Sequence, residues 1–309
     1  MRIMTLGAGA VGGYFAGRLA QSGADVTFLV RERRKAQLAE RGLEIRSALG
    51  DYTGPVKALT PAEIDAPADV VFVACKAYDL ASAIEAIGPA VGDDTAILPL
   101  LNGLAHIEVL NAAFGRHRVL GGVAKIAATL TADGAIQHLN DWRYLTFGEQ
   151  DGSSSARVVA LKAAFDRTSV LATISPAIMQ AMWEKIVHLA TAAGVTCLMR
   201  ANVGEIARAP GGAELMMRFL DANAAIAANE GHPPSEAFMA EYRALFSDQG
   251  SGYTASMLRD IERGGPVEAD HIIGYMLRRA RAHGLDDTLH AIAYTHLKSY
   301  EERRAAGRL

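Results

Sequence analysis

The sequence contains few residues of the kinds that mark secreted, metal-binding or nucleic-acid-binding proteins. Only two of its 309 residues are cysteines, Cys75 and Cys197, and both lie inside apolar runs. We therefore expect buried thiols in a reducing compartment and no disulfide framework. The nine histidines show no zinc-ligand spacing such as H-E-x-x-H, so no metal site is predicted. The formal net charge of −3 gives no basic excess for binding nucleic acid or an anionic membrane.

Long hydrophobic runs are also missing. The most membrane-like segment, residues 186–199, is interrupted by His188 and falls short of the ~20 residues that a bilayer-spanning helix needs. The first predicted strand starts at the initiator methionine, which leaves no room for a signal peptide. We therefore expect a cytoplasmic protein without membrane segments.

The most informative stretch that the sequence does contain lies at its start. An apolar run at 2–6 predicts a strand, and a helical pattern begins at Tyr14. Between them lies a G-x-G-x-x-G motif, Gly7-Ala8-Gly9-Ala10-Val11-Gly12. Strand, motif and helix in this order are typical of a dinucleotide-binding unit. Gly7 would permit the tight turn, Gly9 the approach of a pyrophosphate to the backbone, and Gly12 close packing of helix and strand.

Apolar segments of strand length alternate with helical patterns through the first half of the chain. Strands are predicted at 25–30, 43–46, 55–59, 69–74, 96–101 and 119–128, and helices at 79–91 and 107–114. This alternation predicts a doubly wound parallel sheet. Short antiparallel strands over 134–150, one more helix and a strand at 170–174 are expected to complete the domain, with 43–46 and 55–59 forming a pair.

From Pro176 onward the sequence predicts helices alone. Breaks are expected at Gly194, 210–212, 231–234, 250–252, 264–266 and Gly284. The predicted fold is therefore α/β, with an N-terminal Rossmann-type doubly wound sheet and a C-terminal all-helical domain. Residues 1–175 would bind NADP and residues 176–309 would form the substrate and catalytic domain, with the site in the cleft between them.

Three residues at predicted strand ends are candidates for cofactor binding. Arg31 ends the second strand, nineteen positions after Gly12, where arginine suits the 2′-phosphate of NADP and an acidic residue would suit NAD. The alternative for Arg31 is a solvated helix start. Lys76 and Asn102 end two further strands at the edge where open α/β sheets bind ligands, and we expect both to contact cofactor and substrate. The alternatives are a surface cation for Lys76 and a tight turn for Asn102-Gly103.

The helical half contributes three further candidates. Lys185 precedes the long apolar helix segment and is either a general acid or a snorkelling cation. Ser256 would bind a carboxylate or cap a helix, and Glu268 is a candidate carboxylate at a helix N-terminus. His188 is most simply a core histidine with a hydrogen-bond partner.

Taken together, these motifs resemble the ketopantoate reductases (2-dehydropantoate 2-reductases) over essentially the full chain. The resemblance is carried by the glycine motif, Arg31, CKA at 75–77, LNG at 101–103, MWEK at 182–185, GE at 204–205, SMLRD at 256–260, EADHIIG at 268–274 and RRARAHG at 278–284. It implies an NADPH-dependent reduction of ketopantoate, a 2-keto acid, to pantoate in pantothenate biosynthesis.

The resemblance also implies roles for individual residues. Lys185 would protonate the developing alkoxide, and Glu268 would orient Lys185 and the substrate hydroxyl. Ser256 would bind the substrate carboxylate, while Asn102 would line the nicotinamide and the substrate. Delivery of hydride to a carbonyl leaves an oxyanion, which a positioned ammonium stabilises and protonates.

The sequence departs from the family at the substrate. Ketopantoate reductases carry asparagines four and eight positions after the catalytic lysine, where this chain has Leu189 and Ala193, and Asn202 is shifted by one position. One alternative is therefore a paralogue that reduces a less polar 2-keto acid or ketone. Another is a non-catalytic NADP(H) sensor, against which the presence of Lys185 and Glu268 argues. The sequence does not give the oligomeric state, and a homodimer stays open.

Overall fold

The computed structural model describes all 309 residues and divides into two compact units. Residues 1–101 and 106–178 form the first unit, and residues 102–105 and 179–309 form the second. The two units are defined by their packing alone. The assignment of the N-terminal part to the cofactor and of the C-terminal part to the substrate therefore stays a prediction. None of the helices combines the length and the apolar character that crossing a membrane requires.

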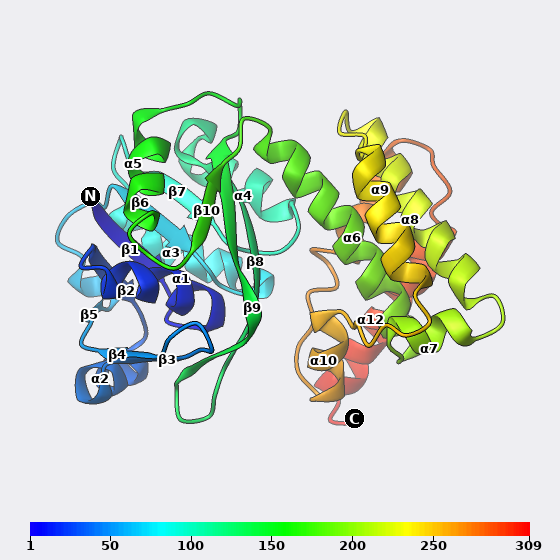
Figure 1. The fold of residues 1–309 in the computed structure, drawn as a ribbon, viewed down its shortest axis with the longest axis horizontal. Coiled ribbons are helices and arrows are strands. Elements are labelled where there is room, and N and C mark those ends of the chain that lie inside the picture. Colours follow the sequence, from blue (N-terminus) through cyan, green and yellow to red (C-terminus); the bar gives the residue numbers. More distant parts are fainter. The chain divides into compact units, whose positions relative to one another are not determined.

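The first unit contains the predicted doubly wound parallel sheet (Figure 1). Its strand order is β5-β2-β1-β6-β7, with β1 at Arg2–Leu6, β2 at Asp25–Leu29, β5 at Lys57–Leu59, β6 at Val70–Val73 and β7 at Ala96–Pro99. Leu6 at the end of β1 is in register with Leu29 of β2 and Val73 of β6. The loops that follow these three strands therefore leave the same edge of the sheet.

A second sheet in the same unit was not predicted. It has the order β10-β9-β3-β4, and β8 pairs with β9. Its strands are β3 (Leu43–Arg46), β4 (Tyr52–Gly54), β8 (Leu120–Leu130), β9 (Ile136–Glu149) and β10 (Leu171–Ile174). The expected pairing of 43–46 with 55–59 is wrong, because β3 pairs with β4 and β9 while β5 joins the parallel sheet.

The prediction for residues 119–150 is right about the strands and the antiparallel pairing, and wrong about the sheet that they join. Residues 119–128 do not extend the parallel sheet beyond one bridge between Val119 and Ile97, and 134–150 is one long strand, not several short ones. β8 and β9 form a long antiparallel hairpin whose turn contains Gly134 at φ 88°. An apolar strand has the same pattern in either sheet, and this local turn decides its partner.

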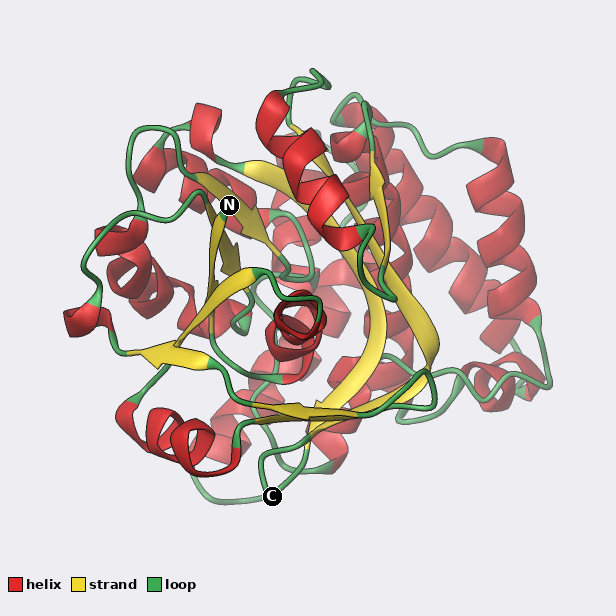
Figure 2. Ribbon diagram, turned by 60° about the vertical axis from the view of Figure 1, so that its left-hand side comes forward, coloured by secondary structure: helices red, strands yellow, loops and turns green.

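Helix α1 (Ala10–Gln21) lies between the two sheets, and the long strands of the second sheet curve around it (Figure 2). A Cβ atom on Gly12 would lie 2.6 Å from the Ala74 Cβ atom, beside the parallel sheet. On the other side, a Cβ on Gly13 would lie 2.4 Å from the Ile136 Cδ1 atom. Gly12 therefore has its predicted packing role. The other helices of this unit are α2 (Glu32–Arg41), α3 (Leu80–Ile87), α4 (Ala105–Phe114) and α5 (Ala156–Phe165).

The second unit is all-helical, as predicted. Its helices are α6 (Ile178–Met199), α7 (Val203–Arg208), α8 (Gly212–Asn229), α9 (Glu236–Ser247), α10 (Ser256–Glu262), α11 (Ile273–Ala282) and α12 (Thr288–Ala305). The predicted break at Gly194 is wrong, since α6 continues through it. A Cβ there would lie 2.4 Å from the Phe219 ring, so glycine at this position allows α6 and α8 to pack closely.

Candidate active site

The glycine-rich loop has an open backbone suited to an anion. Gly7 has φ 87°, which the turn after β1 requires, and no atom lies within 4 Å of the position of a Cβ on Gly9. Gly9 is also the residue that precedes the first turn of α1, where backbone N–H groups lack helical partners. These features fit the phosphates of a dinucleotide.

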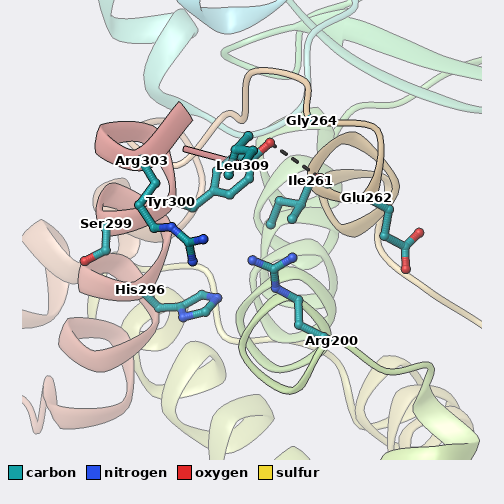
Figure 3. A pocket seen from close by; sticks show the side chains of 9 residues that line it. All are labelled: Arg200, Ile261, Glu262, Gly264, His296, Ser299, Tyr300, Arg303 and Leu309. Carbon is teal, nitrogen blue, oxygen red and sulfur yellow. Dashed lines mark hydrogen bonds between the residues drawn. The ribbon is translucent and has the colours of Figure 1, made fainter. Parts of the chain in front are cut away.

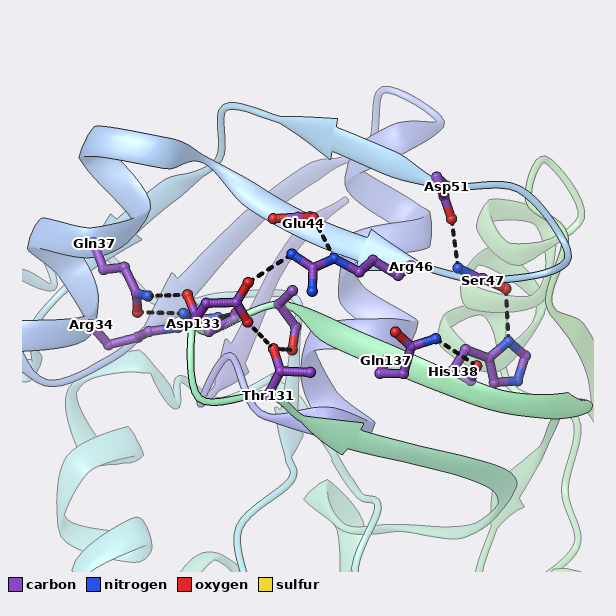
Figure 4. A network of polar contacts seen from close by, with 12 residues as sticks. Arg34, Gln37, Glu44, Arg46, Ser47, Asp51, Thr131, Asp133, Gln137 and His138 are labelled. Atoms are coloured by element: carbon purple, nitrogen blue, oxygen red, sulfur yellow. Dashed lines mark hydrogen bonds and ion pairs between the residues drawn. The ribbon is translucent and has the colours of Figure 1, made fainter.

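Arg34 holds this loop in place, a role that the sequence did not indicate. Its Nη2 atom donates to the Ala8 carbonyl at 3.2 Å and to the Gly134 carbonyl at 2.9 Å, and Nη1 donates to Gln37 (Figure 4). Burial lowers the pKa of Arg34. The guanidinium group therefore ties α2 to the glycine loop and to the β8–β9 turn.

Arg31 remains available on the surface beside the same edge of the sheet. It follows β2, precedes the first turn of α2, and its exposed side chain makes no hydrogen bond or ion pair. By contrast, Lys35 pairs with Glu63 and Arg34 is committed to the loop. Arg31 thus lies at a solvated helix start, which was the alternative prediction, and its side chain is also free to bind a phosphate.

Lys76 and Asn102 each follow a strand of the parallel sheet by three residues, after β6 and β7. Gly103 has φ 88°, so the predicted tight turn is present. A Cβ on Gly103 would lie 3.0 Å from the His271 carbonyl oxygen. This close approach brings Asn102 to the segment that follows Glu268.

Lys185 and Glu268 come together in the second unit. Lys185 lies in the first half of α6 and is half-buried, and Glu268 is only 9% exposed. Burial lowers the pKa of Lys185 to about 8, and the charge of Glu268 acts in the opposite direction. A snorkelling lysine would keep its ammonium group in water, so the desolvation favours the functional alternative. Glu268 itself precedes α11 by five residues, which corrects the expectation of a helix N-terminus.

Ser256 is exposed at the first position of α10, and its hydroxyl group makes no hydrogen bond within the chain. Ala255 is the residue at the helix cap and no side chain caps this helix, so the capping alternative is wrong. The hydroxyl group is therefore free to donate to a ligand oxygen.

The positions that replace the family's asparagines are apolar in the structure as well. Leu189 is half-buried and Ala193 is buried, and both share a face of α6 with Lys185 by helical spacing. Asn202 does not compensate, because its Oδ1 atom caps α7 by accepting from the Glu205 N–H at 2.9 Å. Its neighbour Val203 is buried and donates its N–H to the Tyr253 carbonyl at 3.0 Å.

An aromatic cluster on the same part of the unit was missed by sequence reasoning. The His188 Nε2 atom lies 2.8 Å from the Tyr253 hydroxyl oxygen, and the His188 ring stacks on Tyr242 with centroids 4.4 Å apart. Phe238 and Phe246 pack against Tyr242. Burial raises the pKa of Tyr242 to about 12. His188 has the predicted hydrogen-bond partner but is half-buried, not in the core, and its position one turn after Lys185 was the available signal.

A glycine-rich loop at the edge of a doubly wound sheet and a desolvated lysine–carboxylate pair define a nicotinamide-dependent oxidoreductase. Residues 3–152 match the family model described as Ketopantoate reductase PanE/ApbA, and residues 177–301 match the model of its C-terminal part. The chain belongs to the ketopantoate reductase family.

Individual relatives cover almost the whole chain. The uncharacterized oxidoreductase YkpB of Bacillus subtilis is 34% identical over 98% of this chain and 100% of its own length. A 2-dehydropantoate 2-reductase of Halobacterium salinarum is 29% identical, covering 92% of this chain and 94% of its own. The crystal structure of 2-dehydropantoate 2-reductase from Geobacter metallireducens superposes with a TM-score of 0.87 at 31% identity, covering 97% of this chain and 99% of that one.

The Lys185 pKa can be measured directly, because the chain has only seven lysines. We expect the ¹³C-dimethylated Lys185 amine to titrate near the pKa of about 8 given by its burial, and Glu268→Gln to lower that pKa further by removing the opposite charge. Glu184→Gln is the control, since the Glu184 carboxylate accepts from the Ser235 N–H at 2.9 Å. A Lys185 resonance that titrates with the other lysines would contradict the desolvation.

Proposed function

We propose that the protein reduces a 2-keto acid with an apolar side chain to the 2-hydroxy acid, with NADPH as hydride donor. The observation that carries the proposal is Lys185, desolvated beside Glu268 on the helix face that also bears Leu189 and Ala193. The family membership supports the reaction class, and the apolar face supports the substrate class.

In this reaction NADPH, when bound, would supply the hydride that forms the new C–H bond at the keto carbon. The carbonyl π electrons move to the oxygen, and the Lys185 ammonium stabilises the resulting oxyanion and transfers its Nζ proton to it. Because its pKa is near 8, Lys185 is largely protonated at neutral pH and yet holds the proton less tightly than an ordinary lysine. Glu268 orients the ammonium, and the free Ser256 hydroxyl donates to the substrate carboxylate.

Asn102, Lys76 and the glycine loop are the residues proposed to bind the cofactor. The loop N–H groups would bind the pyrophosphate, and Lys76 and Asn102, which follow β6 and β7, would contact the nicotinamide end of the cofactor and the substrate. Neither Cys75 nor Cys197 forms a disulfide, which supports the proposal of a reducing location such as the cytoplasm. A homodimer stays a prediction.

The second candidate substrate is ketopantoate itself, which the family name and the names of the relatives favour. Its hydroxyl group would meet the Leu189 and Ala193 side chains where the family offers amides. A buried polar group left without a partner costs ~1–3 kcal/mol, so this hydroxyl group would raise KM by about 5- to 150-fold. The half-buried Tyr242 and Phe238 rings add aromatic surface to the same unit.

The cofactor preference depends on Arg31. We expect Arg31→Ala to weaken NADPH binding by ~1.5–3 kcal/mol, through loss of a charge-assisted phosphate contact, and to leave NADH binding nearly unchanged. The exposed neighbour Arg33 provides the control, and Arg33→Ala should have little effect on either cofactor. Titration of both cofactors into the three proteins measures this, and equal affinity of the unmodified protein for NADH and NADPH would rule out the assignment.

Substrate choice tests the proposal most sharply. We expect a higher kcat/KM for phenylglyoxylate and for 2-keto acids with branched apolar tails than for ketopantoate. In the double variant Leu189→Asn, Ala193→Asn, the ratio of kcat/KM for ketopantoate to kcat/KM for the apolar 2-keto acids should rise by about tenfold or more. Steady-state rates of NADPH oxidation give both values. A KM for ketopantoate well below that for every apolar 2-keto acid would show that the two substitutions are neutral.

A further inference from the structure

A cavity in the helical unit, separate from the candidate active site, has the chemistry of an anion site. Its volume is about 590 Å³, within the ~300–1,000 Å³ of small-molecule sites. It is lined by Arg200 after α6, by Ile261 in α10, and by His296, Tyr300 and Arg303 of α12. Since α6 continues to residue 199 at 1.5 Å per residue, Arg200 lies about 22 Å along the helix from Lys185.

Arg200 occupies a position that usually belongs to glycine. It is the only non-glycine residue with positive φ, at 55°, and the next N–H, of Ala201, donates to the Thr196 carbonyl at 3.4 Å. This is the helix-ending pattern in which glycine normally takes the left-handed residue. An L side chain is strained there, and such strain is found where a side chain serves a site.

Neither guanidinium group of the cavity is neutralised. No carboxylate lies within 4.0 Å of Arg200 or Arg303. Arg200 lies over the Tyr300 ring, 5.7 Å from its centroid, and Arg303 donates to the Arg308 carbonyl at 3.1 Å. Figure 3 shows the two guanidinium groups pointing into the same space, while the Glu262 carboxylate points away. The cavity thus presents two cationic hydrogen-bond donors that lack an anion.

His296 lines the same cavity. Its Nε2 atom is buried without a hydrogen-bond partner, and its ring faces the same space (Figure 3). Burial and the charge of Arg200 lower the His296 pKa. A matching ligand therefore carries anionic oxygens that the two guanidinium groups can bind.

We propose that this cavity binds the phosphoryl group of a small phosphorylated metabolite. Arg200 and Arg303 would hold the anionic oxygens. A phosphate monoester carries between one and two negative charges near neutral pH, because its second pKa is about 6, and this charge matches the two guanidinium groups. The Tyr300 ring and Ile261 would contact the rest of the molecule. The site is independent of the proposed reaction.

Isothermal titration of the full chain with inorganic phosphate and phenyl phosphate tests the site. NADPH is kept saturating so that the glycine loop and Arg31 are occupied, and chloride holds the ionic strength constant. We expect saturable binding, tighter for phenyl phosphate than for benzoate. Arg200→Gly should weaken it by about tenfold or more without loss of thermal stability, since glycine takes the left-handed conformation freely. Arg303→Gln should also weaken it, whereas Arg263→Ala, an exposed charge outside the cavity, should change it less than about twofold.

Three outcomes would overturn the proposal: no saturable binding of either phosphate, equal binding by Arg200→Gly and the unmodified protein, or binding of benzoate as tight as that of phenyl phosphate. If Arg263→Ala lost as much phosphate affinity as Arg200→Gly, the binding would reflect diffuse charge attraction and not a defined site. None of these readouts uses turnover, so they are unaffected if the proposed reductase activity fails.

Discussion

The burial of the Lys185 ammonium group beside Glu268 is the physical constraint on which the proposed chemistry depends. An ammonium group removed from water lowers its own pKa, and a nearby carboxylate recovers only part of the lost hydration. Near Lys185 along α6, Met182, Trp183 and Ile186 are buried in the core. A desolvated lysine at such a position costs stability, and perturbed pKa values of this kind are concentrated at functional sites.

The first unit positions its ligand-binding loop by different means. The register of β1 with β2 and β6 brings three loops to one sheet edge, and glycines on two sides of α1 allow a second sheet to pack on the helix that follows the glycine loop. Arg34 then fixes the loop from α2 and from the β8–β9 turn. The loop is therefore held by the long hairpin as well as by the strand before it.

Local sequence patterns were enough to predict the parallel sheet and the helical character of the second unit, whereas the site residues stay a prediction. The glycine motif and the lysine ahead of an apolar helix segment carry their chemistry in short stretches of sequence. The second sheet could not be predicted, because residues 119–128 have the apolar pattern of a parallel strand, whereas β8 pairs antiparallel with β9 through the turn at Gly134. The role of Gly194 could not be predicted either. Its sequence context predicts a helix break, whereas in the structure it makes room for Phe219, which lies 25 positions later in the chain. The contact of His188 with Tyr253 likewise joins residues 65 positions apart.

The central claim, that Lys185 donates the proton, is tested most directly by the pH dependence of kcat/KM for 2-keto acid reduction in the unmodified protein and in Lys185→Ala. Because the ammonium is the active form, we expect a plateau at low pH and a tenfold fall per pH unit above the Lys185 pKa of about 8. Lys185→Ala should lose ~10²–10⁴-fold in kcat and lose this alkaline limb, with cofactor binding retained. A variant that keeps kcat within a few-fold, with the same pH profile, would contradict the assignment.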